Sequence, residues 1–252
     1  MARSRATTSS MANANGFIDQ CNLSKELMRK IAKSSPVIIG TGKSGHNRNI
    51  RHIVINIAEL TSDAILEELR IELQKNLKRR GITASVELSN AEWVVAAPNN
   101  RATGGGVKHR DVKNRQPGYL TVILFLGDRE SEGYGTVKIW RNTQTFMEGH
   151  TFIPNDKGIF KNSKRKLGRF DEAEKGGGER GLDFRPEKFN CAIFDSRLWH
   201  QSQPHSSPRA HRVSLTCFLT LKEGILQAPP PPNTTYYLQK SEWGVADLSK
   251  YI

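Results

Sequence analysis

The pattern of apolar residues changes at Gly81, and this change constrains the fold more than any other feature of the sequence. Residues 63–80, which precede it, carry leucines at helical spacing: Leu66, Leu69, Leu73 and Leu77. After Gly81, apolar residues alternate with polar ones or form short runs, which is typical of strands. Helices followed by strands exclude an alternating βαβ chain. We therefore expect an α+β or mainly β fold in which helices back a barrel or sandwich.

Two helices and six strands are expected. The first helix covers residues 23–33, with Ser24 as its N-cap, and the second covers 63–80, with Ser62 at its start. The expected strands cover 82–88, 92–97, 119–126, 136–140, 189–194 and 212–220.

Composition divides the chain into four parts. They are a disordered N-terminal tail (1–15), a helical support region (16–82), a strand-rich core (83–222), and a proline-rich spacer with a C-terminal arm (223–252). Residues 156–183 interrupt the strand pattern of the core with basic clusters and three consecutive glycines, so they are expected to form an insertion.

The chain is strongly basic, with a formal net charge of +13 over 252 residues. Such a charge favours an anionic partner, for example nucleic acid or an anionic substrate. The densest run, residues 157–169, holds six basic residues and no acid: Lys157, Lys161, Lys164, Arg165, Lys166 and Arg169. We expect this run to contact the anionic partner; a solvated loop is the alternative.

Several classes of protein are excluded. No apolar run approaches the roughly 18 residues that a membrane span needs. The three cysteines are widely spaced, which argues against a disulfide framework and for a reducing compartment inside the cell, most simply the cytoplasm. The basic, serine-rich residues 1–15 leave an organellar transit peptide as an alternative.

Residues 36–44 resemble a phosphate-binding loop, but the resemblance fails in detail. Gly42, Lys43 and Ser44 are present, whereas Val37 stands where the first glycine is required. The following residues are also poor helix formers, so the helix N-terminus that would bind phosphate is missing. Nucleotide hydrolysis is therefore excluded.

One histidine motif has metal-ligand spacing. Of seven histidines, only His109 is followed two positions later by a carboxylate, Asp111. In a strand, residues i and i+2 point to the same face, so both side chains can ligate one metal ion. Two histidines and one carboxylate form the triad that holds non-haem Fe(II) and leaves positions open for a co-substrate and oxygen.

A second motif lies in the strand expected at 212–220. Arg212, Ser214 and Thr216 alternate there with apolar residues, so a guanidinium and a hydroxyl share one face. The planar fork of an arginine matches a carboxylate, so this face is suited to binding one. An edge strand with its polar face in water is the alternative.

Taken in order, these motifs resemble the Fe(II)/2-oxoglutarate-dependent dioxygenases, and most closely their prolyl-hydroxylase-like branch. The resemblance spans about residues 85–222. It rests on His109-x-Asp111, a strand from Thr121 to Gly127, a distal His200 within Phe-Asp-Ser…His-x-x-Gln-Pro, and Arg212-x-Ser214. In that branch a threonine follows the first metal histidine by twelve positions, as Thr121 follows His109.

The resemblance implies a double-stranded β-helix, or jelly roll, backed by the N-terminal helices. It also implies that His109, Asp111 and His200 ligate Fe(II) at the catalytic centre, and that Arg212, assisted by Ser214, binds the distal carboxylate of 2-oxoglutarate. The implied activity consumes O2 and 2-oxoglutarate and hydroxylates a C–H bond.

One position departs from the branch. A tyrosine that contacts 2-oxoglutarate is often found where this chain has Phe125. Tyr119 and Thr121 lie on the same expected strand face and are candidates for the missing contact.

Three questions stay open at the level of sequence. His205 and Arg209 are alternatives to His200 and Arg212, although both lie in a Ser/Pro-rich turn. The branch favours a protein side chain, proline above all, as substrate, whereas the charge favours nucleic acid or another anion. A non-catalytic basic jelly roll that binds nucleic acid is the alternative function.

Overall fold

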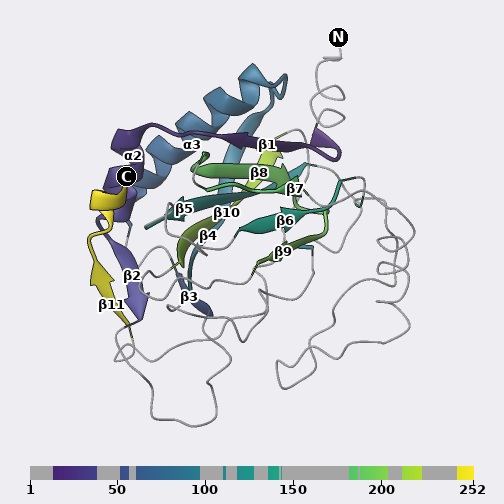
Figure 1. Cartoon of the computed structure of the whole chain (residues 1–252). Helices are drawn as coiled ribbons and strands as arrows, with labels where there is room; N and C mark the ends of the chain where they lie inside the picture. Colours follow the sequence, from purple (N-terminus) through teal and green to yellow (C-terminus); the bar gives the residue numbers. More distant parts are fainter. Residues whose placement is uncertain are drawn as a thin grey trace, which may run out of the picture.

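The computed structural model describes residues 14–38, 52–56, 61–96, 110–111, 118–127, 136–141, 143, 182–186, 188–203, 212–222 and 243–252. In these parts the chain is mainly antiparallel sheet with two α-helices (Figure 1). In chain order the elements are β1 (Ile18–Cys21), α2 (Lys25–Ala32), β2 (Ser35–Ile38), β3 (His52–Asn56), α3 (Asp63–Arg79), β4 (Ser85–Ala96), β5 (Tyr119–Leu126), β6 (Val137–Ile139), β7 (Leu182–Asp183), β8 (Cys191–Asp195), β9 (His200–Ser202), β10 (Arg212–Lys222), β11 (Trp243–Ala246) and a 3-10 helix, η3 (Ser249–Tyr251).

The strands form one large sheet and two small ones. The large sheet has the order β1-β8-β5-β10-β4-β3, and the small sheets have the orders β7-β6-β9 and β11-β2. From β5 onward the chain passes repeatedly between the large sheet and the sheet of β6, β7 and β9. Residues of β5 and β8 pack against residues of β6, so the two sheets face each other as in a sandwich.

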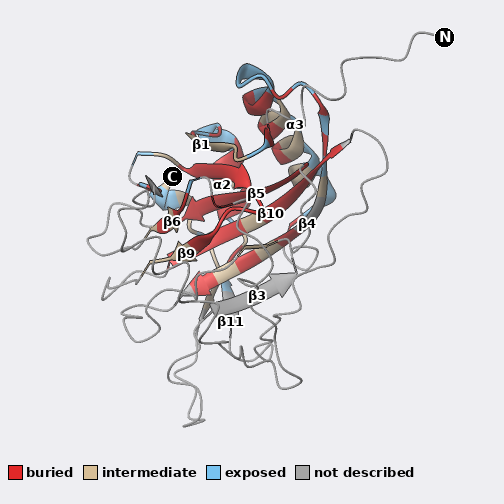
Figure 2. Cartoon of the chain, turned by 90° about the vertical axis from the view of Figure 1, so that its right-hand side faces the viewer, coloured by how far each residue is buried: buried red, intermediate tan, exposed pale blue. Residues whose placement is uncertain are grey.

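The large sheet has an apolar core on each of its faces. On one face, Val213, Leu215 and Cys217 of β10 pack in a cluster with Leu27 of α2 and Leu73 of α3. On the other face, residues of β5, β6 and β8 form a second cluster, which includes Ile123, Phe125, Val137, Ile139, Ala192 and Phe194. Figure 2 shows that β5 is buried along its length and that β10 is mostly buried.

The alternation along β10 determines which residues face the small sheet. Since Val213, Leu215 and Cys217 face the helices, Arg212 and Ser214 point to the opposite, inner face. This orientation agrees with the register predicted from the sequence.

The turn at Gly81 explains why the apolar period changes there. Gly81 has φ 84°, a left-handed conformation that favours glycine. The backbone N–H of Ile82 donates to the carbonyl of Leu77 at 3.0 Å, which ends the helix as a Schellman motif does. The chain is then redirected into β4.

Several expected elements differ from the structure. The strands expected at 82–88 and 92–97 are one strand, β4, whose register against β10 shifts between Phe218 and Leu219. The support region 16–82 is not purely helical, because β1, β2 and β3 lie within it. These strands are only four or five residues long, too short to show a period.

The ends of the chain are partly described. Ala14, at the end of the expected tail, is buried, and residues 1–13 lie outside the described residues. In the expected C-terminal arm, β11 pairs with β2, while residues 223–242 are not described. Of the expected insertion, only β7 at its end is described. No helix in the described parts is long and apolar enough to cross a membrane.

Candidate functional site

Two of the predicted metal ligands lie side by side. Oδ1 of Asp111 and Nε2 of His200 are 3.5 Å apart, and the two side chains are 11% and 6% exposed. Two ligand atoms about 2.1 Å from a shared metal ion are separated by about 3.0–3.5 Å at angles from octahedral to near-tetrahedral. The observed separation fits a shared cation.

A backbone carbonyl orients the imidazole of His200. Nδ1 lies 3.1 Å from the carbonyl oxygen of Leu198, which can only accept, so Nδ1 carries the proton. In the neutral ring, Nε2 then has its lone pair directed toward Asp111. Metal-binding histidines are commonly held in this way. The ring of His200 also packs against Phe194, with centroids 4.9 Å apart.

The backbone holds Asp111 in place. Its N–H donates to the carbonyl of Ser196 at 3.0 Å, and the N–H of Ser196 donates to the carbonyl of Tyr119 at 3.0 Å. The hydroxyl of Thr121, on β5, donates to Oδ2 of Asp111 at 2.5 Å. Asp111 is thus fixed against the strand that contains Thr121.

The predicted carboxylate clamp lies further along the same inner face. Arg212 is 4% exposed and its Nη1 donates to the carbonyl of Gln203 at 2.7 Å. Ser214 is 7% exposed, and its hydroxyl lies 3.3 Å from the carbonyl oxygen of Val94. A buried guanidinium beside a hydroxyl is suited to binding a carboxylate.

The structure separates the two candidates for the missing tyrosine contact from this clamp. Phe125 pairs directly with Ser214, whereas Thr121 pairs with Phe218 and Tyr119 with Thr220. At about 3.3 Å per residue, Thr121 and Tyr119 lie about 13 and 20 Å along β5 from Phe125. Phe125 itself stacks on Phe184, with ring centroids 4.8 Å apart.

The hydroxyl groups of these two side chains lie in different surroundings. The hydroxyl of Thr121 is directed to Asp111. Burial raises the pKa of Tyr119, so its phenol stays neutral and can donate a hydrogen bond. Neither residue pairs with the part of β10 that contains Arg212 and Ser214.

A buried ion pair supports the segment that leads to His200. Arg197 Nη2 lies 2.6 Å from Asp195 Oδ2, and Arg197 Nε lies 2.9 Å from Asp195 Oδ1. The same Nη2 donates to Asn15, and the N–H of Gly16 donates to Asp195. This cluster joins the N-terminal segment to the turn between β8 and β9.

Other predicted residues lie outside the described part of the chain: His109, His205, Arg209 and the basic residues Lys157, Lys161, Lys164, Arg165, Lys166 and Arg169. Within the described residues, no group of three histidine, cysteine or acidic side chains is placed to hold a metal ion. Of the three predicted metal ligands, the described residues therefore include Asp111 and His200 but not His109.

Sequence analysis did not single out Ser196. It stands in the Phe-Asp-Ser motif beside the predicted site, but its side chain has no pattern of its own. Its importance comes from the contacts of its hydroxyl and backbone with Thr121, Tyr119 and Asp111, which are distant in sequence.

No protein-family model matches the chain, and no curated protein matches it. Solved structures do resemble it. AviO1 from Streptomyces viridochromogenes Tue57 superposes with a TM-score of 0.51 at 12% identity, covering 91% of this chain and 100% of that chain. The non-heme alpha ketoglutarate dependent carbocyclase SnoK from nogalamycin biosynthesis superposes with a TM-score of 0.50 at 12% identity, covering 89% and 97%.

These two similarities show that the chain has the fold of AviO1 and SnoK. A prolyl hydroxylase from Trichoplax adhaerens, solved with a peptide fragment, superposes with a TM-score of 0.44 at 14% identity, covering 86% of this chain and 90% of that chain. So loose a similarity carries no argument for the prolyl-hydroxylase-like branch.

Proposed function

We propose that this chain is an Fe(II)- and 2-oxoglutarate-dependent oxygenase with a double-stranded β-helix core. The observation that carries the proposal is the approach of Asp111 Oδ1 to His200 Nε2 at 3.5 Å, from segments 89 positions apart. With Nδ1 protonated, a neutral His200 and an ionised Asp111 face each other as two acceptors, which repel unless a proton or cation lies between them. The donor set therefore fits a metal ion.

The fold supports the same function. SnoK, which has this fold, is an alpha-ketoglutarate dependent enzyme by its description. The inner face of β10 also carries Arg212 and Ser214, a clamp suited to the distal carboxylate of 2-oxoglutarate. A fold can host other functions, so the site residues carry the argument.

In the proposed enzyme, His109, Asp111 and His200 hold Fe(II), and Arg212 with Ser214 orients 2-oxoglutarate. Bound iron and 2-oxoglutarate supply the oxidising chemistry, which consumes O2, releases succinate and CO2 and hydroxylates a substrate C–H bond. The facing sheets exclude water from the ligands, since Asp111 and His200 are nearly buried. A protein side chain such as proline is the substrate that the sequence resemblance favours.

The test is a binding experiment without oxygen. Fe(II) and 2-oxoglutarate added anaerobically to the full chain should give a weak visible charge-transfer band, and air should then release succinate. Asp111→Ala should abolish both while the protein stays folded. Glu87→Ala removes an exposed carboxylate of β4 and is the matched control. A band of equal strength in Asp111→Ala would contradict the proposal.

The same experiment decides between the two candidate distal histidines. His200→Ala should abolish the band, and His205→Ala should leave it unchanged. The opposite result would assign the role of distal metal ligand to His205 instead of His200.

A nucleic-acid or other anionic partner is a second candidate function, favoured by the net charge of +13. Binding through Lys157, Lys161, Lys164, Arg165, Lys166 and Arg169 should weaken steeply with salt. Neutralising Lys164, Arg165 and Lys166 should lower both the affinity for a DNA oligonucleotide and the salt slope. Unchanged affinity and slope would contradict a role for this run.

A further inference from the structure

We infer that Thr121 and Ser196 are positioning residues for the metal-binding carboxylate of Asp111. Their hydroxyls form a short chain that fixes which carboxylate oxygen faces His200. This inference rests on the proposed function, and it assigns Thr121 to Asp111 instead of to 2-oxoglutarate.

The number of hydroxyl hydrogens determines which group donates and which accepts in these hydrogen bonds. The oxygen of Thr121 lies 2.5 Å from Oδ2 of Asp111 and 2.9 Å from the oxygen of Ser196. Thr121 has a single hydroxyl hydrogen, and the ionised carboxylate can only accept, so Thr121 donates to Asp111. Ser196 then donates to Thr121.

The hydrogen bonds of Thr121 and Ser196 give the two carboxylate oxygens of Asp111 different roles. Oδ2 accepts from Thr121, while Oδ1 is the oxygen that lies 3.5 Å from Nε2 of His200. Loss of this hydroxyl would remove the hydrogen bond that holds Oδ2 and so weaken the distinction between the two oxygens. Hydrogen bonds of this kind to a metal-binding carboxylate orient it and are worth about 10–100-fold in metal affinity or activity.

The surroundings make the arrangement rigid. Thr121 is 0% exposed and Ser196 is 1% exposed, so water does not compete for either hydroxyl. The backbone N–H of Asp111 donates to the carbonyl of Ser196. The same residue therefore anchors both the main chain and, through Thr121, the side chain of Asp111.

A matched control exists in the same sheet. Thr220 of β10 is on the same face as Thr121, is 6% exposed, and its hydroxyl has no hydrogen-bond partner among the described residues. Replacing either threonine by valine keeps the shape and removes the hydroxyl. Only the change at Thr121 should alter metal binding.

The experiment measures the dissociation constant of Co(II), followed by its visible absorption, for the wild-type chain and for Asp111→Ala, Thr121→Val, Thr121→Ser and Thr220→Val. Thr121→Val should weaken Co(II) binding by about 10–100-fold and change the visible band, because the ligand oxygen is no longer fixed. Thr121→Ser should restore most of the affinity, and Thr220→Val should match wild type. A merely structural role for Thr121 would leave the band unchanged.

Ser196→Ala provides a second test if Thr121→Val does not fold. It removes the donor behind Thr121 and keeps the bond to Asp111, so it should weaken Co(II) binding by less than Thr121→Val. Suppose that Asp111→Ala abolishes Co(II) binding. Unchanged Co(II) binding in Thr121→Val then overturns the inference. If Thr121→Val does not fold, unchanged binding in Ser196→Ala overturns it. If Asp111→Ala binds Co(II) as wild type does, the proposed function itself fails.

Discussion

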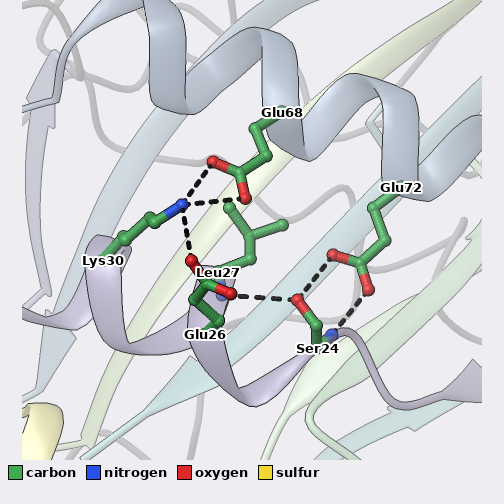
Figure 3. A network of polar contacts seen from close by, with 6 residues as sticks. All are labelled: Ser24, Glu26, Leu27, Lys30, Glu68 and Glu72. Atoms are coloured by element: carbon green, nitrogen blue, oxygen red, sulfur yellow. Dashed lines mark hydrogen bonds and ion pairs between the residues drawn. The ribbon is translucent and has the colours of Figure 1, made fainter.

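Two clusters of polar side chains in this molecule use similar groups in opposite surroundings. Between α2 and α3, Lys30 pairs with Glu26 and Glu68 at 3.2 and 3.0 Å, with all three side chains at least 38% exposed (Figure 3). Beside the candidate site, Arg197 pairs with Asp195 at 2.6 Å, with 7% and 2% exposure. The two pairs have similar distances but differ in how far their side chains are exposed to solvent.

Exposure decides what each cluster contributes. Charges in water are screened and long side chains lose entropy when they pair, so exposed pairs contribute little. A buried charge that loses its partner cannot be solvated instead, and breaking such a pair is strongly destabilising. We therefore expect the cluster between the helices to tolerate substitution, whereas the one that supports His200 should not.

The largest effect is expected from Arg197→Met. It leaves the buried Asp195 carboxylate without its guanidinium, beside the backbone N–H groups of Gly16 and Arg197, and should lower the free energy of unfolding by about 3–5 kcal/mol. Urea denaturation measures the loss. Asp195→Asn added to Arg197→Met should recover part of it, because the unpaired charge is removed. A loss below about 1 kcal/mol would place this pair in the same class as surface pairs.

Arg212→Ala should have the next largest effect, on function instead of folding. Removing the buried guanidinium should raise the 2-oxoglutarate requirement about 100-fold or more and leave metal binding intact. Arg212→Lys should recover only part, since an ammonium lacks the planar fork. A 2-oxoglutarate titration of succinate formation measures the change. Arg209→Ala is the control; damage there and not in Arg212→Ala would contradict the assignment.

The sequence predicted the parts of the fold whose signal is local. The leucines of residues 63–80 predicted α3, and the apolar run of residues 119–126 predicted β5 with the observed bounds. The alternation in β10 placed Arg212 on the inner face. In each case the pattern extends over eight or more residues, long enough for its period to be visible.

What the sequence missed depends on distant partners. β1 spans four residues and pairs with β8, so that Ile18 lies opposite Phe194, 176 positions away. Two strands were expected at 82–88 and 92–97, but a bulge opposite β10 keeps β4 continuous between them. No local period predicts either feature.

The candidate site shows the same limit. The resemblance to the dioxygenases placed Asp111 and His200 in one site, and the structure brings the two side chains together. Sequence gives the strand face of Thr121, which made it a candidate for contacting 2-oxoglutarate, but it does not give the hydrogen bond from its hydroxyl to Asp111. That hydrogen bond is visible only once Asp111 and Ser196 are in place.

A smaller effect is expected at the N-cap of α2. The hydroxyl of Ser24 accepts from the N–H of Leu27 at 3.3 Å and donates to Glu72 at 3.0 Å (Figure 3). Ser24→Ala should lower the free energy of unfolding by about 1 kcal/mol, measured by urea denaturation. Ser62 occupies the same position at α3 but makes no side-chain cap bond, so Ser62→Ala should cost less. Equal losses would contradict the capping role.

The smallest effect is expected from Lys30→Met. Hydrogen bonds from Lys30 to Glu68 and then to Glu26 raise the pKa of Lys30 above its ordinary value of 10.5. A raised pKa means that the pair stabilises the fold fully below 10.5 and that this contribution is lost as the pH rises through the folded-state pKa.

Urea denaturation should therefore show a loss in Lys30→Met that is smaller than in Ser24→Ala and that disappears at high pH. The loss should also vanish in about 1 M salt, where screening acts over about 3 Å. The loss in Arg197→Met should persist in the same salt, because the Asp195 pair is shielded from solvent. If salt removed both losses equally, burial would not be what separates the two clusters.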